Sequence, residues 1–212
     1  MKNLALVAGI FALCLALALL ATSWNGGSLT AHMIVHMTTV AIAAPLLAIA
    51  VSGRRLDPAV HLPWFGPLLA SVAELIVVWL WHMPALRRLA EARLDAMLLE
   101  QASFLLAGIL LWTACFRRHD EGAQRLAGII GLLFTSIHMT LLGVLLTLAP
   151  HPLYGIGDVT CLGFVLGRDT DQQLGGVVML LVGAAAYMLG ALILLADVLK
   201  PTSSRGNQCG SG

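Results

Sequence analysis

Charge is scarce in this sequence. Asp, Glu, Lys and Arg make up 11% of the 212 residues and hydrophobic residues make up 59%, whereas a soluble domain carries about 25% charged residues. One large core cannot account for a deficit of this size, so the composition excludes an ordinary soluble protein. The net charge of +1 supplies no basic patch, and we predict no nucleic-acid partner.

Cysteine and catalytic motifs are also sparse. The four cysteines stand without a CxxC pair or a regular spacing, which favours neither a zinc site nor a disulfide framework. The sequence has no nucleotide-binding loop, no HExxH and no GxSxG. It also lacks the repeated broken helices that are typical of secondary transporters. We therefore predict that the chain is not an enzyme.

Long apolar segments, separated by bursts of charge, make up most of the chain. Six have the length of a membrane span, at 4–22, 30–52, 66–84, 96–116, 126–149 and 173–199. They predict an all-α integral membrane bundle of about six transmembrane helices, forming a single domain over 1–200, with a polar, disordered tail at 201–212. The first segment resembles a cleavable signal, but its apolar run is long for one, and we expect a retained anchor.

The distribution of Lys and Arg predicts the orientation. Eight of these residues fall in the N-terminal segment, the 53–65 and 117–125 loops and the C-terminal segment, and four fall in the other three loops. Positive residues are enriched in cytoplasmic loops. Both termini are therefore predicted to be cytoplasmic.

Histidine and methionine recur together on the other side. Four histidines are each followed by methionine, in the pairs His32-Met33, His36-Met37, His82-Met83 and His138-Met139, and His151 follows the fifth span. Imidazole with thioether is a ligand set that suits Cu(I). Because His32 and His36 are four residues apart, they share one helix face, against which the antiparallel third span would place His82. The spacing fits either of two arrangements: a ladder of sites that runs inward to His138, or one outer site with a separate deep histidine. The alternative is that these residues have packing roles and bind no metal.

Other polar residues enter the predicted spans. Glu100 and Gln101 could orient a histidine or could be solvated at the interface, and Glu74 could handle a proton or cation or could be a structural hydrogen-bond partner. Asp171 suits a helix N-terminus, while Gln172 and Gln173 suggest inward hydrogen bonds.

Several segments carry a family resemblance. HMIVHM, WHMP, LLWTACF, MTLLGVLLTLAPHPLY and DQQLGG, spread over about residues 30–199, together resemble the CtaG-type cytochrome c oxidase assembly family of bacterial inner-membrane proteins. The resemblance implies a role in maturing haem–copper oxidases, with a haem–copper oxidase subunit and a periplasmic copper donor as partners. It also implies that the polar core consists of His32, His36, His82 and Asp171-Gln172-Gln173.

These observations lead to one expected function with two alternatives. We expect a membrane assembly factor that binds Cu(I) near the periplasmic face through His and Met and passes it to the oxidase. Paired helical histidines also ligate haem, so a b-type haem-binding membrane cytochrome is an alternative. A metal-free scaffold that holds an oxidase subunit is the other.

Overall fold

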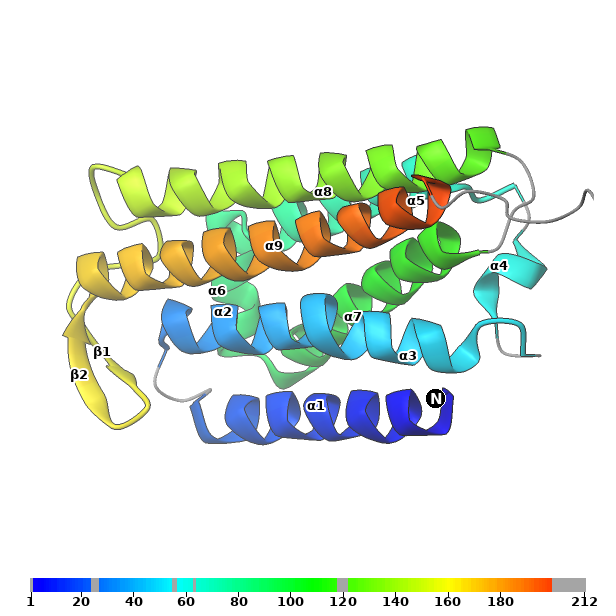
Figure 1. Cartoon of the computed structure of the whole chain (residues 1–212). Coiled ribbons are helices and arrows are strands. Elements are labelled where there is room, and N and C mark those ends of the chain that lie inside the picture. The colour runs from blue at the N-terminus through cyan, green and yellow to red at the C-terminus, as the bar shows by residue number, and fades with distance from the viewer. Residues whose placement is uncertain (1, 24–26, 55–56, 63, 118–121, 200–212) are drawn as a thin grey trace, which may run out of the picture.

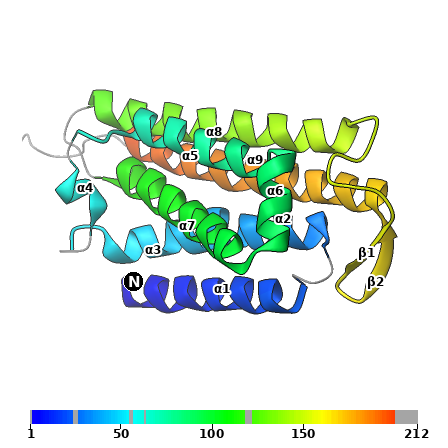
Figure 2. The same cartoon turned by 180° about the vertical axis from the view of Figure 1, so that it is seen from behind.

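The computed structural model describes residues 2–23, 27–54, 57–62, 64–117 and 122–199, which form a bundle of roughly aligned long helices (Figures 1 and 2). Five helical stretches are long and apolar enough to cross a membrane, or six when one bent pair is counted as a span. This confirms the prediction of an all-α membrane bundle. The predicted disorder of 201–212 lies outside the described residues. The long elements are α1 (Lys2–Ser23), α2 (Leu29–Met37), α3 (Ala44–Val51), α5 (Pro67–Trp81), α7 (Leu94–Phe116), α8 (Gly122–Leu148) and α9 (Arg168–Leu199).

The third span ends earlier than the sequence indicated. Helix α5 stops at Trp81, and α6 (Pro84–Ala92) continues at an angle of 70° to it. Pro84 begins α6, where its missing N–H costs no hydrogen bond. In both views α6 lies across the direction of the long helices (Figures 1 and 2). The chain therefore turns sharply at His82.

The second span contains a wide turn. A π-helical segment, η2 (Thr38–Ala43), separates α2 from α3. The indole N–H of Trp112 on α7 donates to the carbonyl of Val40, 3.0 Å away. Helix α7 packs closely here, because a Cβ added at Gly108 would lie 2.9 Å from the Cβ of Ala44.

Asp171, near the start of α9, fixes the start of α2. Its buried carboxylate accepts hydrogen bonds from the Ser28 hydroxyl at 2.6 Å and from the backbone N–H groups of Leu29 and Thr30 at 2.6 and 3.2 Å. An anion at a helix N-terminus satisfies free N–H groups and complements the helix dipole. The predicted capping residue thus caps a different helix from its own.

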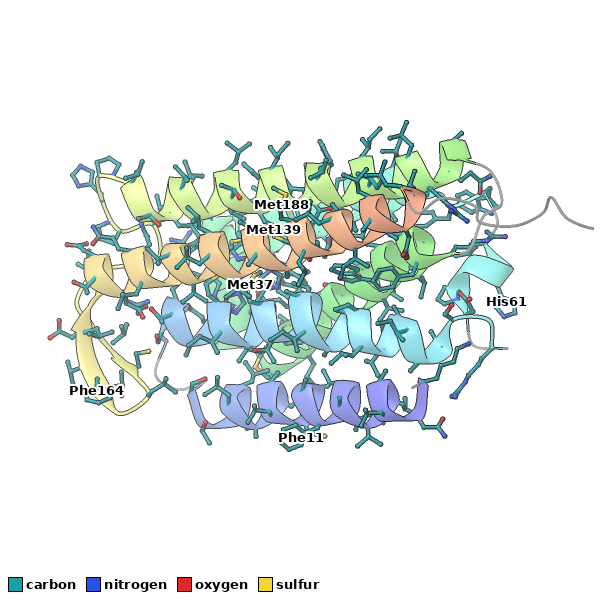
Figure 3. All side chains as sticks on the ribbon, in the orientation of Figure 1. Phe11, Met37, His61, Met139, Phe164 and Met188 are labelled. Carbon is teal, nitrogen blue, oxygen red and sulfur yellow. The ribbon has the colours of Figure 1, made fainter. Side chains whose placement is uncertain are left out.

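The end of the bundle where α2 and α9 begin, here called the histidine end, carries a small addition to the helical fold. Strands β1 (Asp158–Cys161) and β2 (Phe164–Gly167) form an antiparallel hairpin between α8 and α9, in which Asp158 pairs with Gly167. A short helix, α4 (Pro58–His61), lies at the opposite end (Figure 1). Figure 3 shows Phe11 and Phe164 on the outside of the molecule.

Candidate metal centre

Three predicted histidines meet inside the histidine end. His32 and His36 come from α2, and His82 comes from the break between α5 and α6. Their ring centroids lie 6.2 Å apart for His32 and His36, 5.6 Å for His32 and His82, and 5.4 Å for His36 and His82. All three side chains are buried. We call these residues the histidine cluster.

Phe104 of α7 closes one side of the cluster. Its ring centroid lies 4.0 Å from that of His36, and about equally far, at 6.2 and 6.1 Å, from those of His32 and His82. Phe104 is itself fully buried. It is therefore positioned to limit how the three imidazoles rotate.

Hydrogen bonds set the tautomers of two rings. Nδ1 of His82 lies 2.6 Å from the Val78 carbonyl oxygen, so Nδ1 must donate and the lone pair of the neutral ring is at Nε2. Nδ1 of His32 lies 2.9 Å from Nη1 of Arg87. Because arginine only donates, this Nδ1 accepts and the proton of neutral His32 sits on Nε2. Neither nitrogen of His36 has a hydrogen-bond partner in the described chain.

A buried ion pair lies beside the cluster. Nη1 of Arg87 donates to both carboxylate oxygens of Glu100 at 3.1 Å, and Nε of Arg87 lies 3.3 Å from Glu91. The amide of Gln101 donates to Glu100 at 3.4 Å. The carboxylate of Glu100 lies 3.8 Å from Nδ1 of His32. Glu100 and Gln101 thus belong to the surroundings of the cluster.

Tyr154 supports the cluster from the loop after α8. Its buried hydroxyl donates to the backbone carbonyl of His82 at 2.8 Å, and burial raises the pKa of Tyr154 to about 12. Gln172 holds this loop, because its side chain accepts from the Leu153 N–H at 2.7 Å and donates to the Leu146 carbonyl at 3.0 Å. Sequence reasoning missed Tyr154 and Arg87 as parts of the site, although Tyr154 lies within a quoted motif.

The structure places the remaining predicted residues elsewhere. Met33, Met37 and Met139 belong to the apolar core, and Figure 3 shows Met37 and Met139 inside the bundle. The side chain of Met83 is 52% exposed, and His151 and Gln173 are also exposed. A ligand role for these residues stays a prediction.

His138 and Glu74 lie deeper. His138 on α8 is buried, neither of its nitrogens has a partner in the described residues, and it is near enough to His36 for a charge on one ring to act on the other. Glu74, in the middle of α5, is fully buried and accepts a hydrogen bond from Tyr187. Neither residue is in the ring contacts that define the histidine cluster.

The size of the cluster matches one small ion. A metal about 2 Å from an imidazole nitrogen lies roughly 3 Å from the ring centroid, so rings around one ion have centroids at most roughly 6 Å apart. The separations of His82 from His32 and His36, 5.6 and 5.4 Å, fall within this limit, and that between His32 and His36, 6.2 Å, slightly exceeds it. Within the described ranges, however, no group of three or more His, Cys, Asp or Glu side chains already has metal-binding geometry. Ring rotation would be needed before three nitrogens met.

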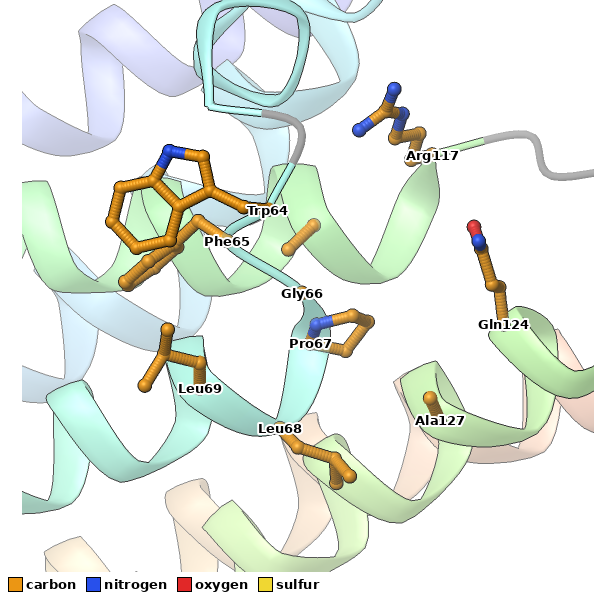
Figure 4. A pocket seen from close by; sticks show the side chains of 10 residues that line it. Trp64, Phe65, Gly66, Pro67, Leu68, Leu69, Arg117, Gln124 and Ala127 are labelled. Atoms are coloured by element: carbon orange, nitrogen blue, oxygen red, sulfur yellow. The ribbon is translucent and has the colours of Figure 1, made fainter.

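Two cavities lie at the opposite end of the bundle. One of about 360 Å³ is lined by residues that include Trp64, Pro67 and Arg117 (Figure 4). Another, of about 510 Å³, is lined by Cys115, Arg117, Arg125 and Asp197, among others. Because both are remote from the histidine cluster, they do not form its entrance.

Comparison with protein-family models gives a match over most of the chain. Residues 1–200 match the family model described as cytochrome c oxidase caa3 assembly factor. No curated protein and no solved structure matches the chain.

Proposed function

This chain belongs to the cytochrome c oxidase caa3 assembly factor family, and from this membership we propose that it delivers Cu(I) to a haem–copper oxidase subunit during assembly. The ion is the cargo, and the histidine cluster is its temporary site. The observation that carries the proposal is the convergence of three buried imidazoles from two separate segments of the chain.

The unpaired nitrogens of the cluster support a ligand. Nε2 of His32, Nε2 of His82 and both nitrogens of His36 have no hydrogen-bond partner among the described residues. Buried polar atoms are satisfied in the great majority of cases. Neutral imidazoles in a low-polarity setting suit Cu(I), which accepts few ligands and leaves a position for the next protein's ligand. The thioethers of Met33 and Met37 are not needed for this minimal site.

Arg87 is the proposed competitor of the ion. While Arg87 donates to Nδ1 of His32, the proton on Nε2 keeps that nitrogen from binding metal. If Arg87 gives up His32 and keeps its contacts with Glu100 and Glu91, the proton of His32 can move to Nδ1, which faces Glu100. Nε2 of His32 is then free to bind the ion. Ion binding and release would then be coupled to a short movement of one guanidinium.

The arrangement of charge supports an orientation with the cluster toward the periplasm of a bacterial inner membrane. Lys2, Arg54, Arg117 and Arg125 lie at the opposite end, where α1 and α8 begin and α3 and α7 end. At the histidine end, Arg87 is paired with Glu100 and Arg93 with Asp95. Over the whole sequence, eight Lys and Arg residues fall on the side away from the cluster and four on the side of the cluster, as expected if the side away from the cluster is cytoplasmic. A periplasmic copper donor and an oxidase subunit are the partners that this orientation fits.

Copper titration of the detergent-purified protein tests the proposal. We expect about one Cu(I) per chain, lost in a variant with His32, His36 and His82 all replaced by alanine. His61→Ala is the matched control, because that histidine is exposed in α4 at the opposite end of the bundle, and it should bind like the wild type. Wild-type stoichiometry in the triple variant would reject the site.

Two further measurements separate the alternatives. A haem absorption band in the purified protein would favour a b-type cytochrome. Full oxidase maturation in cells that carry only the triple variant would favour a metal-free scaffold. For the copper function, we expect no haem band, and we expect oxidase activity to be lost with the triple variant and retained with His61→Ala.

A further inference from the structure

A second buried polar cluster lies deeper in the bundle. Glu74 on α5 is fully buried, and one of its carboxylate oxygens accepts a hydrogen bond of 2.8 Å from the Tyr187 hydroxyl on α9. The other oxygen has no partner in the described chain. Thr135 of α8 faces the carboxyl, and Cys115 of α7 is close enough to interact with it electrostatically.

No cation balances this carboxyl. Among the described residues Glu74 forms no ion pair, and the groups that face it from neighbouring helices are the Tyr187 phenol, the Cys115 thiol and the Thr135 hydroxyl. Arg87 on α6 is paired with Glu100 at the histidine end. Isolated charge in a membrane interior is costly. The carboxyl therefore holds a proton while no cation occupies the histidine cluster.

Glu74 stands between the histidine cluster and a cavity. Toward the cluster, His138 lies one helical turn from Thr135 on α8 and is near His36. Toward the opposite end, Cys115 is near Glu74 and also lines the cavity of about 510 Å³. Six of the buried atoms without a hydrogen-bond partner belong to four residues of this line, namely His36, His138, Thr135 and Glu74. These polar atoms interrupt the apolar core between the histidine cluster and the cavity.

We propose that Glu74 is a proton-exchange site that ionises when a cation occupies the histidine cluster. The inference rests on the proposed function. The balanced step is that one Cu(I) enters, the carboxylic acid of Glu74 becomes a carboxylate, and its proton leaves past Cys115 to water in the cavity. The net charge of the bundle then stays constant.

The separation fixes the size of the coupling. Glu74 and His82 are eight residues apart along α5, which is roughly 12 Å at the rise of a helix. The attraction between a Cu(I) ion in the cluster and an ionised Glu74 at roughly that distance in a protein interior changes the Cu(I) binding constant roughly tenfold. A Glu74→Gln variant keeps the shape and hydrogen bond of the neutral acid, but it cannot ionise.

Two measurements on the whole protein test the exchange. Infrared spectroscopy should detect a protonated carboxyl band that is absent in Glu74→Gln and retained in Asp169→Asn, which changes an exposed acid. Cu(I) affinity, measured against pH, should be the same for wild type and Glu74→Gln at low pH. As pH rises, the wild type should become up to roughly tenfold tighter, and Cu(I) should weaken its carboxyl band.

The outcomes distinguish this inference from the proposed function. If both proteins bind Cu(I) with superimposed pH curves, or if no carboxyl band is specific to Glu74, the exchange is overturned and copper delivery survives. If the wild type binds no Cu(I) at all, both proposals fail. Tyr187→Phe serves as a second variant, since it removes the hydrogen bond but keeps the acid. It should shift the band and preserve the difference from Glu74→Gln.

Discussion

Asp171→Asn should weaken the histidine cluster without touching it. The carboxylate of Asp171 accepts three hydrogen bonds, from the Ser28 hydroxyl that precedes α2 and from the N–H groups of Leu29 and Thr30, and that helix carries His32 and His36. Asparagine has the same shape, but it replaces one acceptor oxygen with an N–H₂ group that faces donors. It also removes the negative charge from the helix N-terminus.

The loss can be worked out from these contacts. One hydrogen bond to a charged acceptor contributes about 1.5–3 kcal/mol, and an anion at a buried helix N-terminus adds about 1 kcal/mol. We therefore expect the variant to be about 3 kcal/mol less stable than the wild type. For a chain of this size, that corresponds to a fall of about 10 °C in the midpoint of thermal unfolding. Thermal unfolding of the detergent-solubilised protein, followed by circular dichroism, measures it.

Asp169→Asn is the matched control. Asp169 also lies in the first turn of α9, but it is exposed, so this variant should stay within about 0.5 kcal/mol of the wild type. Cu(I) affinity should fall in Asp171→Asn and not in the control, because the start of α2 is no longer held. Equal midpoints for the two variants would refute the reasoning.

Three other changes test the packing and polar contacts. Phe104→Ala should lower the stability by about 3–5 kcal/mol and leave the His36 ring free to rotate, whereas Phe104→Leu should cost less. Thermal unfolding of the two variants checks this, and equal losses of stability would contradict it. Gly176→Ala should cost about 3 kcal/mol, because the added Cβ would lie 2.7 Å from the Gly143 carbonyl oxygen. Unfolding in denaturing detergent would detect this loss of stability. An unfolding midpoint equal to that of the wild type would disprove the close approach of α8 and α9. Tyr154→Phe should cost about 1 kcal/mol at neutral pH. Burial raises the Tyr154 pKa to about 12, so this stabilisation is complete below the usual tyrosine pKa of about 10 and is lost as pH rises through about 12. If the difference in stability between the wild type and Tyr154→Phe disappeared below pH 10, that result would contradict the hydrogen bond of Tyr154.

The meeting of the three histidines could be predicted from the sequence for a simple reason. Residues four apart on a helix share a face, and consecutive membrane spans joined by a short loop run antiparallel. His32 and His36 therefore had to lie on one face, and His82 had to lie at the same end of the bundle. The long apolar segments likewise required helices, since a membrane interior leaves no other way to pair the backbone.

Arg87 shows what such reasoning misses. In the sequence it belongs to a charged loop, and a charged loop is normally solvated. Its burial depends on the 70° turn after α5 and on Glu100, which lies 13 positions further along the chain. The environment of Met83 depends on the same turn, which leaves its side chain 52% exposed. A local pattern cannot predict a turn of this kind, because its direction is set by contacts with other helices.

The π-helical segment η2 explains how one face of the second span stays against α7. The contacts come at steps of four residues: the His36 ring against Phe104, the Val40 carbonyl against Trp112, and Ala44 against Gly108. In an α-helix each four-residue step turns the face by roughly 40° more than a full circle, so such a stripe would soon wind away from its neighbour. A π-helical turn contains more residues than an α-helical turn, so a four-residue step falls short of a full circle and rotates the contact face back toward α7. The wide turn that follows the two histidines thus keeps α7, and with it Phe104, against the histidine cluster, which makes η2 part of the site's architecture although it contributes no ligand.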